Sequence, residues 1–289
     1  GLERNGFLHV DEVMAKGVPK GKRKIAELLK KGDEILVQAT KDPMGSKGCR
    51  LTMQVSLAGR FVVYVPFGSG VGVSKRLTED ERRRLKQICS RIPLDGGLIV
   101  RTAGAKRTKA EIKRDYEYLQ RLWEQIRDLT LKSIAPAPIY EEGNLIKRSI
   151  RDLYNREIDE VFVEGEGGYR VAKDFMKMIM PSHAKNVKHY TDALPLFARY
   201  QVESYLSSMF NPTVQLKSGG YIVIGVTEAL VAIDVNSGRA TKEGSIEETA
   251  LKTNLEAAEE VARQSRLRDL AGLIVSDFTD MEAASDTHH

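Results

Sequence analysis

Two apolar segments near the end of the chain flank a helical segment, and this order constrains the fold more than any other feature. Residues 230–235 and 273–275 are apolar runs that predict buried strands. Between them, four apolar residues recur at helical spacing and predict the apolar face of an amphipathic helix, which Gly272 would end: Leu251, Leu255, Ala258 and Ala262. This order favours an α/β fold in which a helical crossover joins two parallel strands.

An aspartate stands at the end of each predicted strand. The crossover would bring Asp234 and Asp277 close together at one edge of the sheet, where open α/β sheets usually place their sites. Adjacent carboxylates repel each other unless a cation lies between them, and their hard oxygen atoms favour Mg²⁺ or Mn²⁺. Asn236 would share the face of Asp234 and could orient a carboxylate or a metal-bound water. Alternatively, both aspartates only cap the turns that follow.

Several short segments occur in one order along the chain. The C-terminal ones are Ile-Asp-Val-Asn (233–236), Ile-Glu-Glu-Thr-Ala (246–250), Thr-Asn-Leu-Glu-Ala-Ala (253–258), Arg-Leu-Arg-Asp-Leu (266–270), Gly-Leu-Ile-Val (272–275) and Asp-Phe-Thr-Asp-Met (277–281). Upstream are Ser-Leu-Ala-Gly (56–59), Leu-Ile-Val-Arg-Thr-Ala-Gly (98–104) and Leu-Pro-Leu-Phe (194–197). Together they resemble the catalytic half of the bacterial ribonuclease E/G family. The resemblance implies that Asp234 and Asp277 hold a catalytic magnesium ion and that Asn236 supports them.

The resemblance also implies a multidomain α/β architecture. Residues 1–56 would form an OB-fold RNA-binding domain, and 57–138 an inserted sensor domain for the 5′-phosphate of RNA. Residues 139–210 would form an RNase H-like structural domain, and 211–289 a DNase I-like catalytic domain. The barrel would lack its first strands and the catalytic domain its C-terminal part. The zinc ligands that the family uses to join protomers are absent from this chain, although the intact protein is expected to be a homo-oligomer.

Further site residues are implied by the same resemblance. Arg101 and Thr102, with the backbones of Gly59 and Val63, would bind the 5′-monophosphate, for which a guanidinium and a hydroxyl are suitable donors. Phe7, Lys41 and Lys47 would contact RNA on the OB domain, the aromatic ring by stacking on a base. From the residues alone, Arg101 could be an ordinary surface arginine and Phe7 a core residue of the barrel.

Local signals predict several other elements. Residues 34–39 read as a strand, and capping boxes at Thr78 and Thr108 predict the starts of two helices. The second helix would bury one stripe of side chains, which includes Trp123: Ile112, Tyr116, Leu119, Trp123 and Ile126.

Composition bounds the class of protein. The 289 residues, 42% of them hydrophobic, suffice for about two cores. A net charge of +5 and a pI near 9.0 hint at an anionic partner, and Lys and Arg gather in residues 75–91 and 106–114, which could also be solvated helix faces. Two cysteines, Cys49 and Cys89, predict no disulfide framework and favour the cytoplasm, and no apolar run is long enough to span a membrane.

The function expected from the sequence is a magnesium-dependent endoribonuclease, with manganese as a possible substitute. It would cleave single-stranded RNA, prefer 5′-monophosphorylated substrates, and act in RNA processing, including rRNA processing, and in mRNA decay. The alternative is an RNA-binding fragment without turnover. A nucleotide-binding α/β protein is disfavoured because the sequence has no Gly-rich phosphate loop.

Overall fold

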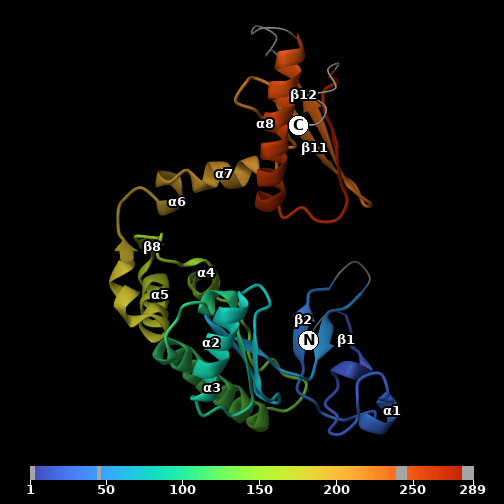
Figure 1. Ribbon diagram of the computed structural model, residues 1–289, viewed down its shortest axis with the longest axis vertical. Coiled ribbons are helices and arrows are strands. Elements are labelled where there is room, and N and C mark those ends of the chain that lie inside the picture. Colours follow the sequence, from blue (N-terminus) through green and yellow to red (C-terminus); the bar gives the residue numbers. More distant parts are fainter. Residues whose placement is uncertain (1–3, 44–46, 239–245, 282–289) are drawn as a thin grey trace. The chain divides into compact units, whose positions relative to one another are not determined.

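The computed structural model describes residues 4–43, 47–238 and 246–281 of a mixed α/β protein (Figure 1). The chain divides into two compact units, residues 1–191 and 192–289. Among the described residues, the first unit has three sheets and two cores, and the second has one sheet and one core. Among the described residues, no helix is both long enough and apolar enough to cross a membrane.

A small sheet begins the first unit. Its strands are β1 (Phe7–Leu8), β2 (Gln38–Lys41) and β3 (Arg50–Thr52), in the order β1-β3-β2, and two short helices lie between β1 and β2: η1 (Val10–Glu12) and α1 (Ile25–Leu28). The predicted strand at 34–39 is wrong in position. Gln38 pairs with Thr52, the last residue of β3, so the residues before Gln38 have no strand to pair with.

A second sheet, in the order β4-β5-β7-β6, lies against two helices. Its strands are β4 (Leu57–Ala58), β5 (Val62–Val65), β6 (Val71–Val73) and β7 (Gly97–Val100); the other elements are α2 (Glu79–Ser90), η2 (Thr102–Gly104) and α3 (Lys109–Lys132). Thr78 and Thr108 cap α2 and α3 as predicted, each accepting a bond from the N–H three residues on. The predicted stripe of α3 is buried, and Trp123 is only 8% exposed.

The rest of the first unit has a core of its own. It consists of α4 (Leu145–Leu153), β8 (Val161–Glu164), α5 (Glu166–Ile179), η3 (Pro181–Asn186) and β9 (Val187–Tyr190), with β8 and β9 paired in parallel. Phe175 and Met176 of α5 are buried in this core with Ile150 of α4.

The second unit contains the predicted strand, helix and strand. After α6 (Leu196–Arg199) and α7 (Val202–Ser208), a sheet forms in the order β10 (Thr213–Gln215), β11 (Tyr221–Val226), β12 (Val231–Asn236), β13 (Ile274–Asp277). Strands β12 and β13 are parallel neighbours joined through α8 (Ile246–Leu267), as predicted. Helix α8 lies along the sheet (Figure 1). It contributes Ala257 to a core that contains Ile222 and Ile233.

The predicted apolar face of α8 is wrong. Leu255 is 47% exposed and Ala258 is exposed, whereas the helix buries small and polar residues: Ala250, Thr253, Asn254, Ala257 and Gln264. Small side chains let the helix approach the sheet closely. The buried amides of Asn254 and Gln264 form hydrogen bonds, whereas the buried Thr253 hydroxyl has no partner among the described residues. The large apolar residues therefore do not mark the face that packs on the sheet.

Candidate functional site: paired carboxylates on an open sheet face

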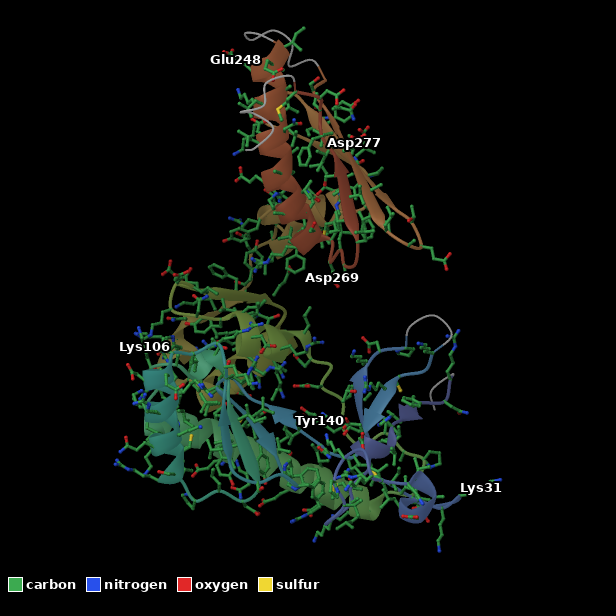
Figure 2. All side chains as sticks on the ribbon, turned by 45° about the vertical axis from the view of Figure 1, so that its right-hand side comes forward. Lys31, Lys106, Tyr140, Glu248, Asp269 and Asp277 are labelled. Carbon is green, nitrogen blue, oxygen red and sulfur yellow. The ribbon has the colours of Figure 1, made fainter. Side chains whose placement is uncertain are left out.

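The two aspartates lie side by side on the sheet of the second unit. Asp234 on β12 and Asp277 at the end of β13 are partners in the parallel register, and both are exposed. Figure 2 labels Asp277 on the second unit. Along β12, Val231, Ile233 and Val235 are buried toward α8, so Asp234 points to the opposite face. Direct partners on neighbouring strands share a face of the sheet, so the crossover places both carboxylates together, as the sequence predicted.

Asn236 lies two residues beyond Asp234 on β12 and contacts it. Its side-chain amide Nδ2 donates a hydrogen bond of 2.9 Å to Oδ2 of Asp234. This bond limits the rotation of the carboxylate and leaves the amide oxygen of Asn236 available to bind a water or a cation.

Two contacts fix the strand end that carries Asn236. Tyr221 pairs with Asn236 in the register of β11 and β12, and a Cβ added to the preceding Gly220 would lie 2.8 Å from the carbonyl oxygen of Asn236. Only glycine permits so close an approach. The turn that precedes Gly220 is held to α8, because the hydroxyl and the N–H of Ser218 both donate to Glu256. The site is therefore built on regular strands supported by a helix.

The donor set at this face fits a hard divalent cation. In the described part of the chain, no lysine or arginine forms an ion pair with Asp234 or Asp277, and no group of three or more His, Cys, Asp or Glu could hold a metal. Mg²⁺ is commonly bound by one or two carboxylates, with waters and substrate phosphate as its other ligands. Two exposed carboxylates and an amide oxygen suit that pattern, whereas zinc prefers Cys and His. Cys49 and Cys89 are both buried and free.

Arg101 and Gly59 meet at the end of the second sheet in the first unit. Nη1 of Arg101 donates to the carbonyl oxygen of Gly59 at 2.5 Å, and Nη2 lies 3.0 Å from Oδ1 of Asp152. Of the five N–H donors of the guanidinium, these contacts use two, and the other three have no partner in the described part of the chain. Thr102 follows directly, and its hydroxyl lies 3.1 Å from that of Ser74. Val63 pairs with Ala58, next to Gly59.

A buried carboxylate shapes the turn that contains Gly59. Asp115 of α3 is fully buried and accepts hydrogen bonds from the N–H groups of Arg60, Phe61 and Val62. Burial raises the pKa of the Asp115 carboxyl, and the three donors oppose that rise. A Cβ at position 59 would lie 2.5 Å from the Asp115 carboxylate, so a glycine is required there.

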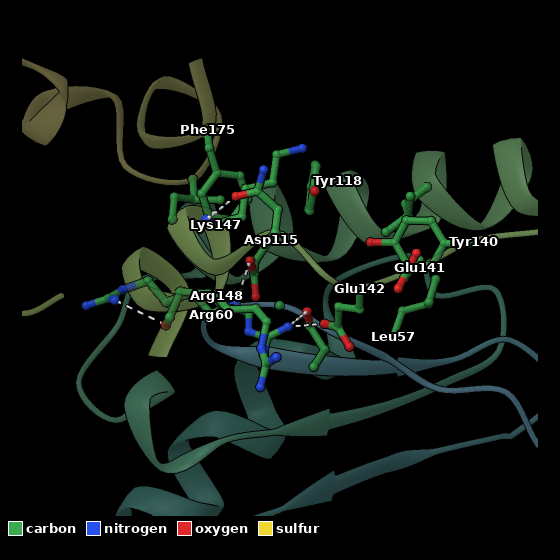
Figure 3. A pocket seen from close by; sticks show the side chains of 16 residues that line it. Leu57, Arg60, Asp115, Tyr118, Tyr140, Glu141, Glu142, Lys147, Arg148 and Phe175 are labelled. Atoms are coloured by element: carbon green, nitrogen blue, oxygen red, sulfur yellow. Dashed lines mark hydrogen bonds and ion pairs between the residues drawn. The ribbon is translucent and has the colours of Figure 1, made fainter. Parts of the chain in front are cut away.

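A cavity of about 110 Å³ lies beside this turn (Figure 3). Its walls come from the turn, from α3, α4 and α5, and from the segment before α4, and include Arg60, Tyr118, Tyr140 and Lys147. Arg101 is not one of the lining residues. The cavity therefore adjoins Gly59 without containing the guanidinium predicted to bind phosphate.

Phe7 and Lys41 lie in one row across the first sheet. Phe7 pairs with Arg50 of β3, and Arg50 pairs with Lys41 of β2. Phe7 is 59% exposed and lies outside the cores of the described residues, and Lys41, Lys47 and Arg50 are exposed. The sequence analysis missed Arg50, because only the register shows that it separates Phe7 from Lys41.

Comparison with known proteins decides the family. Residues 56–289 match the model of the ribonuclease E/G family. The chain belongs to the ribonuclease E/G family. It is 45% identical to ribonuclease E of Haemophilus influenzae over 97% of this chain and 31% of the relative. It is 42% identical to ribonuclease E of Escherichia coli K12 over 97% and 27%, and 35% identical to ribonuclease G of the same strain over 97% and 60%.

The family resemblance inferred from the sequence is thus confirmed. The chain spans 31% and 27% of the length of the two ribonuclease E relatives. The family match covers Asp234, Asn236, Asp277, Gly59 and Arg101, whereas Phe7, Lys41 and Lys47 lie before it.

Proposed function

We propose that this chain carries the metal-dependent catalytic centre of an endoribonuclease that cleaves single-stranded RNA. The observation that carries the proposal is the register of Asp234 with Asp277 on an open sheet face, with Asn236 bonded to Asp234. Membership of the ribonuclease E/G family supports RNA as the substrate. The wider roles expected of such an enzyme are RNA processing, including rRNA processing, and mRNA decay.

Each residue of the site has a distinct task. Asp234 and Asp277 would hold Mg²⁺, or Mn²⁺, through their carboxylate oxygens, and Asn236 keeps the Asp234 carboxylate in one orientation. When bound, the cation would activate a water and neutralise charge that develops on the scissile phosphate. Hydrolysis by this route would leave a 5′-phosphate and a 3′-hydroxyl. The exposed sheet face lets a flexible single strand approach both carboxylates.

The first unit would supply recognition of the RNA. Arg101 keeps three donors for a terminal phosphate, and Thr102 adds a hydroxyl beside them. The row of Phe7, Arg50 and Lys41, with Lys47 nearby in sequence, combines a stacking ring with positive charge, which suits binding without sequence preference. In the expected four-domain arrangement, Arg101 and Thr102 would belong to the 5′-phosphate sensor domain, and the row with Phe7 to the OB-fold domain. The intact enzyme would be an oligomer.

A direct test uses a fluorescent, unstructured RNA with a 5′-monophosphate. The wild-type chain should cleave it with Mg²⁺ and not with a chelator. Asp277→Asn keeps the shape of the side chain but removes a ligand charge, so cleavage should fall by roughly two to three orders of magnitude, as it does when other enzymes lose an essential electrostatic group. RNA affinity, followed by fluorescence anisotropy, should change little.

The matched control is Glu228→Gln, which makes the same change of charge in the hairpin at the other end of β12. It should cleave as the wild type does. Full activity of Asp277→Asn would overturn the proposed site. RNA binding by the wild type without cleavage would favour the alternative, an RNA-binding fragment without turnover.

A further inference from the structure

The buried face of α8 contains an amide that is bonded to the chain just beyond the candidate metal site. Asn254 is 6% exposed and faces the segment that follows β13. Its Nδ2 donates to the carbonyl oxygen of Thr279 at 2.8 Å, and its Oδ1 accepts from the N–H of Thr279 at 2.9 Å. Both polar atoms of the buried side chain are thus satisfied by one residue of the main chain.

This contact lies where β13 has little other support. The strand is four residues long and, in the described part of the chain, pairs only with β12. Its ladder ends at Asp277, opposite Asp234. Thr279 lies two residues after Asp277. Asn254 forms hydrogen bonds with both main-chain groups of Thr279, as a neighbouring strand would. Among the residues that the structure describes, the buried Thr279 hydroxyl has no hydrogen-bond partner, so its side chain adds no polar anchor there.

We infer that Asn254 is a positioning residue for Asp277: it fixes the chain beyond β13 and thereby holds the Asp277 carboxylate beside that of Asp234. The inference rests on the proposed function, in which these two carboxylates share a cation. Asparagine suits the task because its amide provides a donor and an acceptor on a short side chain. An aspartate keeps the acceptor and loses the donor, and an alanine loses both.

The experiment measures Mn²⁺ binding to the 289-residue chain by electron paramagnetic resonance of free Mn²⁺. Asn254→Ala should weaken binding by roughly ten- to a hundredfold, the effect usual for groups that orient metal ligands. Asn254→Asp should weaken it less, because the N–H of Thr279 keeps an acceptor. Hydrogen exchange at the Thr279 amide should accelerate strongly in Asn254→Ala and less in Asn254→Asp.

The matched control is Gln264→Ala on the same helix. Gln264 is also buried, 4% exposed, but within the described ranges its amide bonds only to Glu260 in α8 and to Arg268 just after it. Its loss should lower the unfolding temperature and leave both Mn²⁺ affinity and Thr279 exchange unchanged. If the Asn254→Ala effect were only a general loss of stability, both variants would lose Mn²⁺ affinity. If Asn254 positions Asp277, only Asn254→Ala loses it.

The outcomes distinguish this inference from the proposed function. If Asp277→Asn binds Mn²⁺ as the wild type does, the proposed metal site fails. If Asp277→Asn loses binding while Asn254→Ala and Asn254→Asp keep wild-type affinity, the metal site stands and the positioning role is overturned. If Asn254→Ala does not fold, the comparison of Asn254→Asp with Gln264→Ala decides, with weaker binding in the former supporting the role.

Discussion

Two buried polar side chains hold backbone next to the predicted functional residues. Asp115 accepts three N–H groups from the turn after Gly59, and Asn254 binds the main chain of Thr279 beyond Asp277. Removing such a partner leaves buried donors unsatisfied, which costs about 1–3 kcal/mol per group. Neither role could be read from the sequence, because both depend on contacts between distant segments.

Arg101 should determine any preference for a 5′-monophosphate. Arg101→Ala removes the donors that remain after the bonds to Gly59 and Asp152. The ratio of cleavage rates for 5′-monophosphorylated and 5′-hydroxylated RNA should fall to about one, a loss of roughly ten- to a hundredfold if one or two charged hydrogen bonds are lost. Arg170→Ala, which removes an exposed arginine of α5, is the control. A wild-type ratio in Arg101→Ala would exclude Arg101 from the phosphate site.

If Phe7, Arg50 and Lys41 bind RNA, substitution of a charged residue in this row should change how RNA affinity depends on salt concentration. Arg50→Ala should reduce the slope of log affinity for single-stranded RNA against log salt by about 0.7, the value for one phosphate contact. Phe7→Ala should weaken binding by about 1–3 kcal/mol with the slope unchanged, because stacking carries no charge. Lys188→Ala, an exposed lysine on β9, serves as the control. If Arg50→Ala leaves the slope unchanged, Arg50 does not contact an RNA phosphate, and the proposed RNA contact of this row is wrong.

At the scale of elements, the first turn of α2 should show a pH-dependent contribution to stability. The hydrogen bonds from the Arg84 side chain and the Lys106 N–H lower the pKa of Glu81 to about 2, from an ordinary value of 4.5. Because the folded pKa is the lower one, this stability is present above about pH 4.5 and is lost as the pH falls toward 2. The contacts are partly open to solvent, which reduces their effect.

Glu81→Gln should therefore lower the free energy of unfolding by about 1 kcal/mol at pH 7. The difference from the wild type should shrink between pH 4.5 and the lowest pH at which both stay folded. Urea denaturation followed by circular dichroism measures it. A difference that is constant over this range would mean that the Glu81 bonds do not depend on its charge.

Sequence patterns predicted whether a segment is a helix or a strand better than they predicted its bounds and its buried face. The capped helices at Thr78 and Thr108 and the crossover from β12 to β13 are present because each is set by local periodicity and caps. The strand at 34–39 was misplaced, since its ends depend on where β3 stops. The buried face of α8 was also mispredicted, because Thr253 and Asn254 are buried in preference to Leu255.

The candidate site was predictable to a similar degree. The pairing of Asp234 with Asp277 follows from the strand, helix and strand order, and Asn236 from the period of a strand. The roles of Arg101 and Thr102 came from family resemblance alone and stay predictions. Arg50, Asp152 and Asn254 were missed because register and long-range hydrogen bonds brought them to their places.

At the scale of the whole molecule, each compact unit has a separate task in the proposed function. Residues 1–191 contain the predicted RNA and phosphate contacts, and residues 192–289 contain the paired carboxylates. The second unit should bind the cation whether or not RNA contacts the first. The central claim is therefore that Asp234 and Asp277 together form one cation site.

The most direct measurement is a double-mutant cycle of Mn²⁺ binding to the whole chain, using Asp234→Asn, Asp277→Asn and the combined variant. The wild type should bind one Mn²⁺ tightly, and each single change should weaken that binding strongly. The combined variant should be little weaker than either, because both aspartates hold the same ion. Equal affinity in all four proteins, or losses that add as for independent sites, would contradict the account.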